Sequence, residues 1–306
     1  MLGLTQKSGI ALAAFAGAAA LALGGCSSSD PLAAPSPTNS SSSASGPIVI
    51  GSQAYYSNEI VAEIYAQALE AKGFTVERKF NIGQRDAYIP SLESGEIQLF
   101  PEYTGNLLQF YKPDTTATTA ADVYAALQTA LPAGLEVLDQ STATDQDSYN
   151  VTADFAAKYG LTSLSDLSKV DVPLTLGGAP ELEDRPYGPT GLKSKYGVDV
   201  AFKATGDTTV EDLLAGTVNI ANVYSADPRI QTDKLVTLSD PDGLFLASNV
   251  VPVVNSKIAG SVADVINAVS AALTPEGLVA LNVQSTVDQK STPDIAKAWL
   301  TANGLN

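Results

Sequence analysis

Four tyrosines and one arginine stand in turns or directly after short apolar runs, positions from which a side chain can face a ligand. Tyr103 lies in PEYTGN, Tyr149 in DQDSYNVT, Tyr224 in NVYSADPRI, and Arg185 and Tyr187 share LEDRPYGPTG. None of the five falls in a helical apolar stripe. Electron-rich rings around a cavity attract a quaternary ammonium group, and a guanidinium binds a carboxylate through paired hydrogen bonds. These residues favour a site for a small zwitterion with a bulky cation at one end and a carboxylate at the other.

A loop tyrosine taken alone is more often a partly buried packing residue whose hydroxyl is hydrogen-bonded. The binding hypothesis therefore depends on these residues converging in the fold. Tyr65, Tyr124 and Tyr159 lie inside helical patterns instead, and we interpret them as packing residues.

The composition excludes several catalytic chemistries. The chain has no histidine, and Cys26 is its single cysteine, so His/Cys zinc sites, Ser-His-Asp and Cys-His nucleophiles and disulfides are excluded. Neither a G-x-S-x-G nor a P-loop pattern occurs. We therefore expect no enzyme, no metal site and no cofactor. Two hypotheses compete with a solute-binding function. One is a hydrolase or transferase on a two-lobed α/β scaffold, and the other is a passive envelope lipoprotein that only holds partners together.

The elements that must position the candidate residues alternate between strands and helices. Apolar runs predict strands at PIVIGS, FTVERKF and IQLF, separated by helices at residues 58–72, with Ser57 as the cap, and at 86–94. The alternation returns in VPLTLGG, KSKYG, VAFKAT, TVEDLLAG, VNIANVY and LVTLSD, and three helices follow at about 259–273, 275–283 and 292–302. This order is typical of α/β folds with parallel strands. Roughly 260 residues exceed one typical core, so we expect two lobes.

The ends of two predicted strands carry a tyrosine each. Tyr103 follows the strand that ends near Phe100, and Tyr224 follows VNIANV in the other half of the chain. In open α/β sheets, ligands bind beyond the carboxyl ends of the strands. The sequence therefore predicts a ligand cleft between the two lobes.

The N-terminal segment reads as an export signal. Residues 1–25 carry one charge, Lys7, and a short apolar core that ends in LGGC, too short for a spanning helix of roughly 20 apolar residues. We expect cleavage before Cys26 and lipid attachment there, which would anchor the protein to the cell membrane on its extracytoplasmic side. Residues 26–46 have few large apolar side chains and predict a flexible tether.

The acidic composition limits the partners. The chain has a formal net charge of −16, which would not attract nucleic acid or an anionic lipid surface. We interpret most of this charge as having a general role, because acidic side chains keep an exported protein soluble.

Six segments resemble the ProX-like glycine betaine/choline-binding lipoproteins of ABC importers. These segments are IVIGS, NEIVAEIYAQALEAKGFTVERK, PSLESGEIQLFPEYTGNLL, RPYGPTGLKSKYG, YSADPRI and VVPVVN. The resemblance runs from residue 48 to 306, and PEYTG with LESGEI is its most specific part. It implies a type II periplasmic-binding-protein fold that closes on a quaternary amine and delivers it to a membrane permease. Residues 47–146 plus 251–306 would form lobe 1 and residues 147–250 lobe 2, with hinges near Gln146 and Val250.

The resemblance also implies roles for single residues. The aromatic box of the family maps onto Tyr103, Tyr149 and Tyr224, and its carboxylate-binding arginine onto Arg185. PEYTGN would then be a strand-end turn that places Tyr103 in the cleft.

Three positions depart from the family pattern. Gln53 replaces a lysine, Asn106 replaces a threonine or similar residue, and Ser248 replaces a cage tyrosine, or Asn249 does if the alignment slips by one residue. We expect all three to face the ligand. Two alternatives follow: the pocket binds a different polar or aromatic small molecule, or the missing ring is supplied from another direction by Tyr55, Tyr56 or Tyr187.

Overall fold

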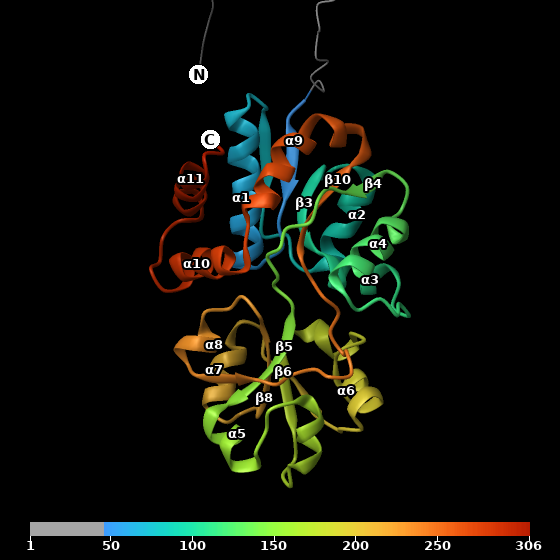
Figure 1. Cartoon of the computed structure of the whole chain (residues 1–306), viewed down its shortest axis with the longest axis vertical. Helices are drawn as coiled ribbons and strands as arrows, with labels where there is room; N and C mark the ends of the chain where they lie inside the picture. Colours follow the sequence, from blue (N-terminus) through green and yellow to red (C-terminus); the bar gives the residue numbers. More distant parts are fainter. Residues whose placement is uncertain (1–45) are drawn as a thin grey trace, which may run out of the picture. The chain divides into compact units, whose positions relative to one another are not determined.

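The computed structural model describes residues 46–306, so the predicted signal, Cys26 and nearly all of the tether lie outside the described residues. Two five-stranded sheets form the framework (Figure 1). The first sheet has the order β2-β1-β3-β10-β4 and the second the order β7-β6-β8-β5-β9. The predicted α/β class with two lobes is confirmed.

The first sheet draws its strands from both ends of the described chain. Its strands are β1 (Ile48–Gly51), β2 (Val76–Lys79), β3 (Leu99–Tyr103), β4 (Leu135–Val137) and β10 (Val250–Asn255). β1 pairs in parallel with β2 and β3, whereas β10 runs antiparallel to β3 and β4. Tyr103 pairs with Val250 at the end of this ladder. The carboxyl end of β3 therefore lies beside the segment through which the chain returns from the second sheet.

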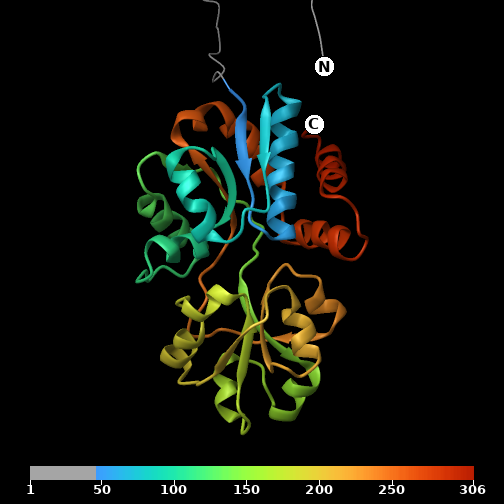
Figure 2. The same cartoon turned by 180° about the vertical axis from the view of Figure 1, so that it is seen from behind.

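Seven helices accompany the first sheet within the described residues. They are α1 (Tyr56–Ala71), α2 (Arg85–Ser94), α3 (Thr104–Tyr111), α4 (Ala120–Ala130), α9 (Ser256–Ala272), α10 (Pro275–Thr286) and α11 (Thr292–Asn303). α1 contacts the sheet and all three C-terminal helices, and Figure 2 shows α10 and α11 beside it. The helix begins one residue before the predicted Ser57 cap, with Tyr55 at the cap position. Ser57 is instead buried in the first turn.

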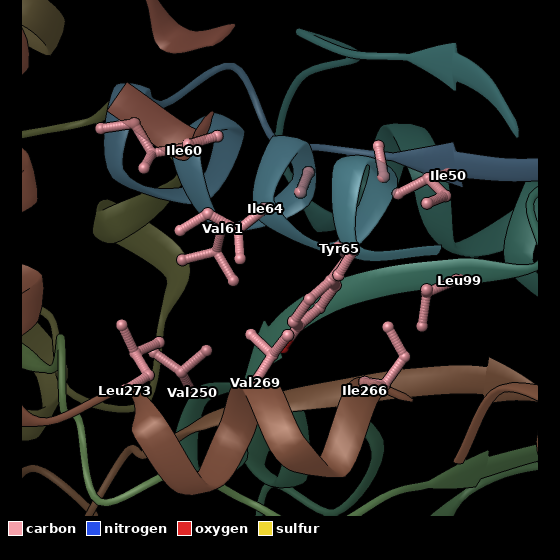
Figure 3. Close-up of a cluster of buried hydrophobic side chains, with 14 of the residues drawn as sticks. Ile50, Ile60, Val61, Ile64, Tyr65, Leu99, Val250, Ile266, Val269 and Leu273 are labelled. Atoms are coloured by element: carbon pink, nitrogen blue, oxygen red, sulfur yellow. The ribbon is translucent and has the colours of Figure 1, made fainter. Parts of the chain in front are cut away.

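The apolar stripe of α1 forms the centre of the largest core cluster. Tyr65 points toward Ile266 and Val269 of α9, and Ile60 and Ile64 are buried in the same cluster (Figure 3). Burial of an aliphatic side chain of this size contributes about 1.5–3 kcal/mol. Tyr65 is thus a packing residue, as its helical spacing predicted.

The second sheet repeats the plan of the first. Its strands are β5 (Asp147–Thr152), β6 (Thr175–Gly178), β7 (Ala201–Ala204), β8 (Ile220–Tyr224) and β9 (Leu235–Thr237). β6 pairs in parallel with β7 and β8, and β5 runs antiparallel to β8 and β9. Four short helices, α5 (Ala153–Tyr159), α6 (Pro189–Tyr196), α7 (Thr209–Leu214) and α8 (Arg229–Thr232), accompany it, with 3₁₀ turns η1 (Leu164–Lys169), η2 (Pro180–Asp184) and η3 (Gly206–Thr208).

Two chain segments connect the sheets, and they pair with each other. Thr144 forms an antiparallel bridge with Asn249. The backbone N–H of Asp145 donates to the backbone carbonyl of Ser248 at 3.3 Å, and the backbone N–H of Val250 donates to the backbone carbonyl of Ala143 at 2.9 Å. Figure 1 shows both connections passing from one sheet to the other. This pairing places Asp145 and Ser248 at the junction of the lobes.

The described part of the chain contains no single helix that is long and apolar enough to cross a membrane. α9 and α10 reach that length and composition only as a pair, bent by 88° between them.

Candidate ligand-binding site

Two of the predicted tyrosines meet in one cavity at the junction of the lobes. Tyr103 ends β3, Tyr224 ends β8, and both line a cavity together with five further residues, Gln53, Tyr55, Arg85, Asn106 and Asp145. The side chains nearly fill this space, leaving about 10 Å³, roughly the room of one water molecule. We call it the tyrosine cavity. A solute as large as a quaternary amine enters it only if these side chains or the lobes move apart.

Tyr55 adds a third ring to this cavity. Its ring centroid lies 5.0 Å from that of Tyr224 and 4.9 Å from that of Tyr56. The Tyr55 hydroxyl donates to Oδ2 of Asp145 at 2.9 Å. Tyr55 precedes α1 and Tyr224 ends β8, so the ring pair joins the two lobes. Tyr55 thus presents a ring to the cavity from the segment before α1.

The carboxylate in PEYTG belongs to a buried ion pair. Oε1 and Oε2 of Glu102 accept from Nε and Nη2 of Arg85, each at 2.8 Å. The Tyr88 hydroxyl and, at 2.7 Å, the backbone N–H of Tyr103 also donate to this carboxylate. Both members of the ion pair are almost completely buried. This network fixes the backbone at Tyr103 and presents Arg85 to the cavity.

Asn106 connects the lobes beside the cavity. Its Nδ2 donates to Oδ2 of Asp147 at 2.6 Å and to the Tyr187 hydroxyl at 3.2 Å. Its Oδ1 accepts from the Ser248 hydroxyl at 2.7 Å, and Ser248 Oγ in turn accepts from the backbone N–H of Gly105 at 3.2 Å. Ser248 is buried and orients Asn106. The structure therefore places the predicted Ser248 behind Asn106, outside the lining of the tyrosine cavity.

Gly105 explains why α3 can begin so close to the connecting segment. A Cβ atom at this position would lie 2.7 Å from the carbonyl oxygen of Ala247 and 2.9 Å from Cβ of Leu246. Backbone atoms cannot yield to such a contact, so glycine is required here. The close approach brings Asn106 within reach of Ser248.

Arg185 and Tyr187 line a second small cavity, which shares Arg85 and Tyr224 with the first. Nη2 of Arg185 lies 3.3 Å from Oδ2 of Asp86, which is largely exposed. Arg185 and Tyr224 thus line the same cavity. Tyr103 lines only the tyrosine cavity, so Arg85 and Tyr224 lie between Arg185 and Tyr103 as the residues common to both cavities.

Gln53 lines the tyrosine cavity. Its side chain is buried, and within residues 46–306 its Nε2 has no hydrogen-bond partner. An amide N–H in this position can donate to a ligand oxygen, although without the charge of a lysine.

The structure does not bring Tyr149 into this group. Tyr149 is completely buried in β5, its hydroxyl donates to the backbone carbonyl of Tyr187, and its ring packs edge-on against Phe245 with centroids 5.0 Å apart. Asn249 is also buried, and its Nδ2 donates to the carbonyl of Ser141 at 3.0 Å. Both residues hold the framework around the cavities.

Sequence reasoning missed three charged residues of the site: Arg85, Asp145 and Asp147. Arg85 starts α2, and the two aspartates flank Gln146 in DQD, at the predicted crossing between lobes. The two acids at the predicted crossing between the lobes were the sequence feature that could have identified Asp145 and Asp147 as site residues.

The two aspartates lie in different surroundings. Oδ1 of Asp147 accepts from Nδ2 of Asn222 at 2.7 Å. Burial raises the pKa of Asp145 to about 7, against the hydrogen bonds from the Ala226 N–H and the Tyr55 hydroxyl.

A larger cavity of about 800 Å³ adjoins the tyrosine cavity. The two share Tyr55 and Tyr224 as lining residues. The larger cavity also includes Tyr56 and three acids, Asp207, Asp227 and Asp233. Arg229 also lines it, paired with Glu211 and Asp233. The rings and the remaining carboxylates favour a cation over an anion. Among residues 46–306 no group of three or more potential metal ligands lies close enough to hold a metal ion.

Comparisons with known proteins agree with this architecture. The glycine betaine-binding protein YehZ of Escherichia coli strain K12 is 26% identical over 283 residues, which cover 85% of this chain and 92% of YehZ. The structure of apo YehZ from E. coli aligns with a TM-score of 0.63, at 27% identity, over 85% of this chain and all of that one. A structure of a glycine betaine/carnitine/choline ABC transporter protein shares the fold, with a TM-score of 0.70 at 19% identity over 84% of this chain and 99% of that one. Residues 46–302 match the OpuAC family model, described as the substrate-binding domain of ABC-type glycine betaine transport systems, and the protein therefore belongs to this family.

Proposed function

We propose that this protein captures a quaternary-ammonium osmoprotectant of the glycine betaine or choline type and delivers it to the permease of an ABC importer. The observation that carries the proposal is the convergence of Tyr55, Tyr103 and Tyr224 on one cavity that also contains Arg85. Each ring that faces a desolvated cation contributes about 0.5–2 kcal/mol. Arg85, Gln53 and Arg185 supply N–H donors for a ligand carboxylate.

The family supports this role. Its members are extracytoplasmic transport proteins, not enzymes, that bind small solutes and deliver them to an ABC permease. The E. coli relative is named as a glycine betaine-binding protein.

The narrowness of the tyrosine cavity supports a mechanism of opening and closing. Asn106 bonds to Asp147 and Tyr187, and Arg185 contacts Asp86, so the lobes are held together at several points. A ligand would enter after these contacts separate and would be enclosed when they form again. The paired connecting segments near Gln146 and Val250 are the proposed hinge.

The membrane attachment is proposed from the sequence. Residues 1–25 would be removed as a signal peptide, and a lipid on Cys26 would anchor the protein to the cell membrane on the extracytoplasmic side. The tether up to residue 46 would let the lobes reach the permease. The partners are thus a small quaternary amine, the permease and the lipid anchor, without nucleic acid.

Calorimetry of the purified full chain tests the proposal. The protein is titrated with glycine betaine, choline, carnitine and proline betaine, and we expect saturable binding of at least one. Tyr224→Ala, which removes a ring shared by the tyrosine cavity, the second small cavity and the larger cavity, should weaken that binding. Silence with all four solutes would overturn the proposed ligand class and favour a different polar or aromatic solute in the same importer architecture.

A further inference from the structure

Asp145 is a buried carboxylate for which the described residues supply no cationic partner. Its side chain is 2% exposed, Oδ1 accepts from the Ala226 N–H at 3.0 Å, and Oδ2 accepts from the Tyr55 hydroxyl at 2.9 Å. No lysine or arginine in residues 46–306 forms an ion pair with it. A buried carboxylate without a counter-ion is costly in its charged form.

The carboxylate lies in the lining of the tyrosine cavity. Tyr55, Tyr103 and Tyr224 line this cavity with Asp145, so the three rings and the carboxylate surround one space. π-faces and a carboxylate both attract a cation, and neither attracts an anion. The same few side chains thus offer a cation two kinds of electrostatic attraction.

None of the titratable groups that face Asp145 within residues 46–306 is a cation paired with it. Asp227 disfavours the ionised form of Asp145, and Tyr55, Tyr56, Tyr103 and Tyr224 face it as neutral hydroxyls. Arg85 also lines the cavity, but its Nε and Nη2 are already bound to Glu102. The cationic side chain in the lining therefore forms its ion pair with Glu102 and not with Asp145.

We propose that Asp145 is the counter-ion of the ligand, and that its carboxylate contacts the ammonium group and loses its proton to solvent when the ligand binds. The inference rests on the proposed capture of a quaternary amine. It assigns Asp145 to the cation end of the site, which the predicted cage of tyrosines left without a charged residue.

The proposal makes binding dependent on pH in one direction. The pKa of Asp145 is about 7 because the carboxyl group is buried. At lower pH the carboxyl group is neutral, and a cation must displace its proton. At higher pH the carboxylate is already charged, so the affinity no longer changes. Affinity for a permanent cation should therefore rise about tenfold between about pH 6 and pH 8.

Choline is the probe because its charge is independent of pH in this range and it has no carboxylate. The full chain is titrated with choline chloride at several pH values, in buffers of different ionisation enthalpy. We expect the affinity to rise with pH and close to one proton to be released at the low end. Asp145→Asn should abolish both the pH dependence and the proton release, and should weaken binding about tenfold or more at pH 8.

Two further variants separate the possible causes. Asp264→Asn removes one exposed negative charge on α9 and should leave the choline affinity and its pH profile unchanged. Tyr224→Ala should weaken binding but retain the proton release, because the counter-ion is still present.

The possible results separate the two proposals. Binding of choline without proton release, or an Asp145→Asn profile equal to that of the wild type, would overturn the role of Asp145 and leave the proposed function standing. No binding of any quaternary amine would overturn the proposed function itself. If Asp145→Asn does not fold, the proton release of the wild-type protein still decides the question.

Discussion

Asn106 at the start of α3 donates from its Nδ2 to Oδ2 of Asp147 at the start of β5, across 2.6 Å. One end of this hydrogen bond belongs to the helix that follows the first sheet's β3, and the other end belongs to the second sheet. The contact therefore links the lobes directly beside the tyrosine cavity. Because Asn106 is oriented by Ser248 on the connecting segment, the same network joins the proposed hinge to the proposed site.

We predict that Asn106→Ala shifts the unliganded protein toward separated lobes. A hydrogen bond to a charged group contributes about 1.5–3 kcal/mol, and the variant loses this contact to Asp147. Small-angle X-ray scattering of the unliganded protein should show a larger radius of gyration than that of the wild type. Asn303→Ala, whose amide contacts only the backbone within α11, is the matched control and should leave the radius unchanged. An unchanged radius in Asn106→Ala would mean that other contacts hold the lobes.

Breaking the ion pair between Arg85 and Glu102 should strongly destabilise the fold. Glu102→Gln leaves a buried guanidinium without its anion, which typically costs about 3–5 kcal/mol in the free energy of unfolding. Urea denaturation measures this loss. Glu96→Gln is the control, because Glu96 pairs with Lys79 at the exposed surface and should change stability little. Similar losses in the two variants would contradict the importance assigned to the buried pair.

We propose that Tyr224 contacts the ligand and that Tyr149 only packs in the core, and calorimetry with choline distinguishes these roles. Tyr224→Ala should weaken binding by about 1–2 kcal/mol through the loss of a ring face. Tyr149→Phe keeps the ring and removes only the hydroxyl bond to Tyr187, so it should lower the stability by about 1 kcal/mol and leave the affinity unchanged. A Tyr149→Phe variant that loses affinity as strongly as Tyr224→Ala would place Tyr149 at the ligand.

Arg185 should distinguish betaine from choline, since only betaine carries a carboxylate. Arg185→Ala should weaken glycine betaine by about 1.5–3 kcal/mol and choline much less. Asp86→Ala is the matched comparison, because it removes the interlobe contact of Arg185 but keeps the guanidinium, so it should affect glycine betaine and choline alike. Equal losses for both ligands in Arg185→Ala would move Arg185 out of the ligand site.

Asp145 should also make the stability of the unliganded protein depend on pH. Its pKa is raised from an ordinary value near 4 to about 7 by burial, so the folded state holds the proton more tightly than the unfolded chain. Its stabilising contribution is therefore complete below about pH 4 and is lost as the pH rises to about 7. Urea denaturation should show Asp145→Asn gaining stability relative to the wild type over this range, by ~4 kcal/mol at most. A difference that stays constant with pH would contradict the raised pKa.

The alternation of apolar segments predicted both α/β lobes, the three C-terminal helices and the positions of Tyr103 and Tyr224 at strand ends. Periodicity and turn residues act over a few neighbouring residues, so such features can be read locally. The specific motif PEYTG then indicated the family, which the comparisons confirmed.

The site required the tertiary structure wherever a role depends on a distant partner. Tyr149 stands in a polar segment, yet its side chain enters the core because β5 pairs with β8 and β9 in a register that turns it toward Phe245. Glu102 and Arg85 are separated by a helix, and their ion pair forms only when β3 and α2 pack together.

Asp145 shows the same distinction at the proposed binding site. The sequence determined that an acid stands at the crossing between the lobes. Its lack of an ion pair among residues 46–306 and its burial among Tyr55, Tyr103 and Tyr224 arise from both lobes together. Local sequence decides which residue ends a strand, because backbone propensity and periodicity are local. The environment of its side chain is decided by long-range packing, because burial and electrostatic partners come from segments far apart in the chain.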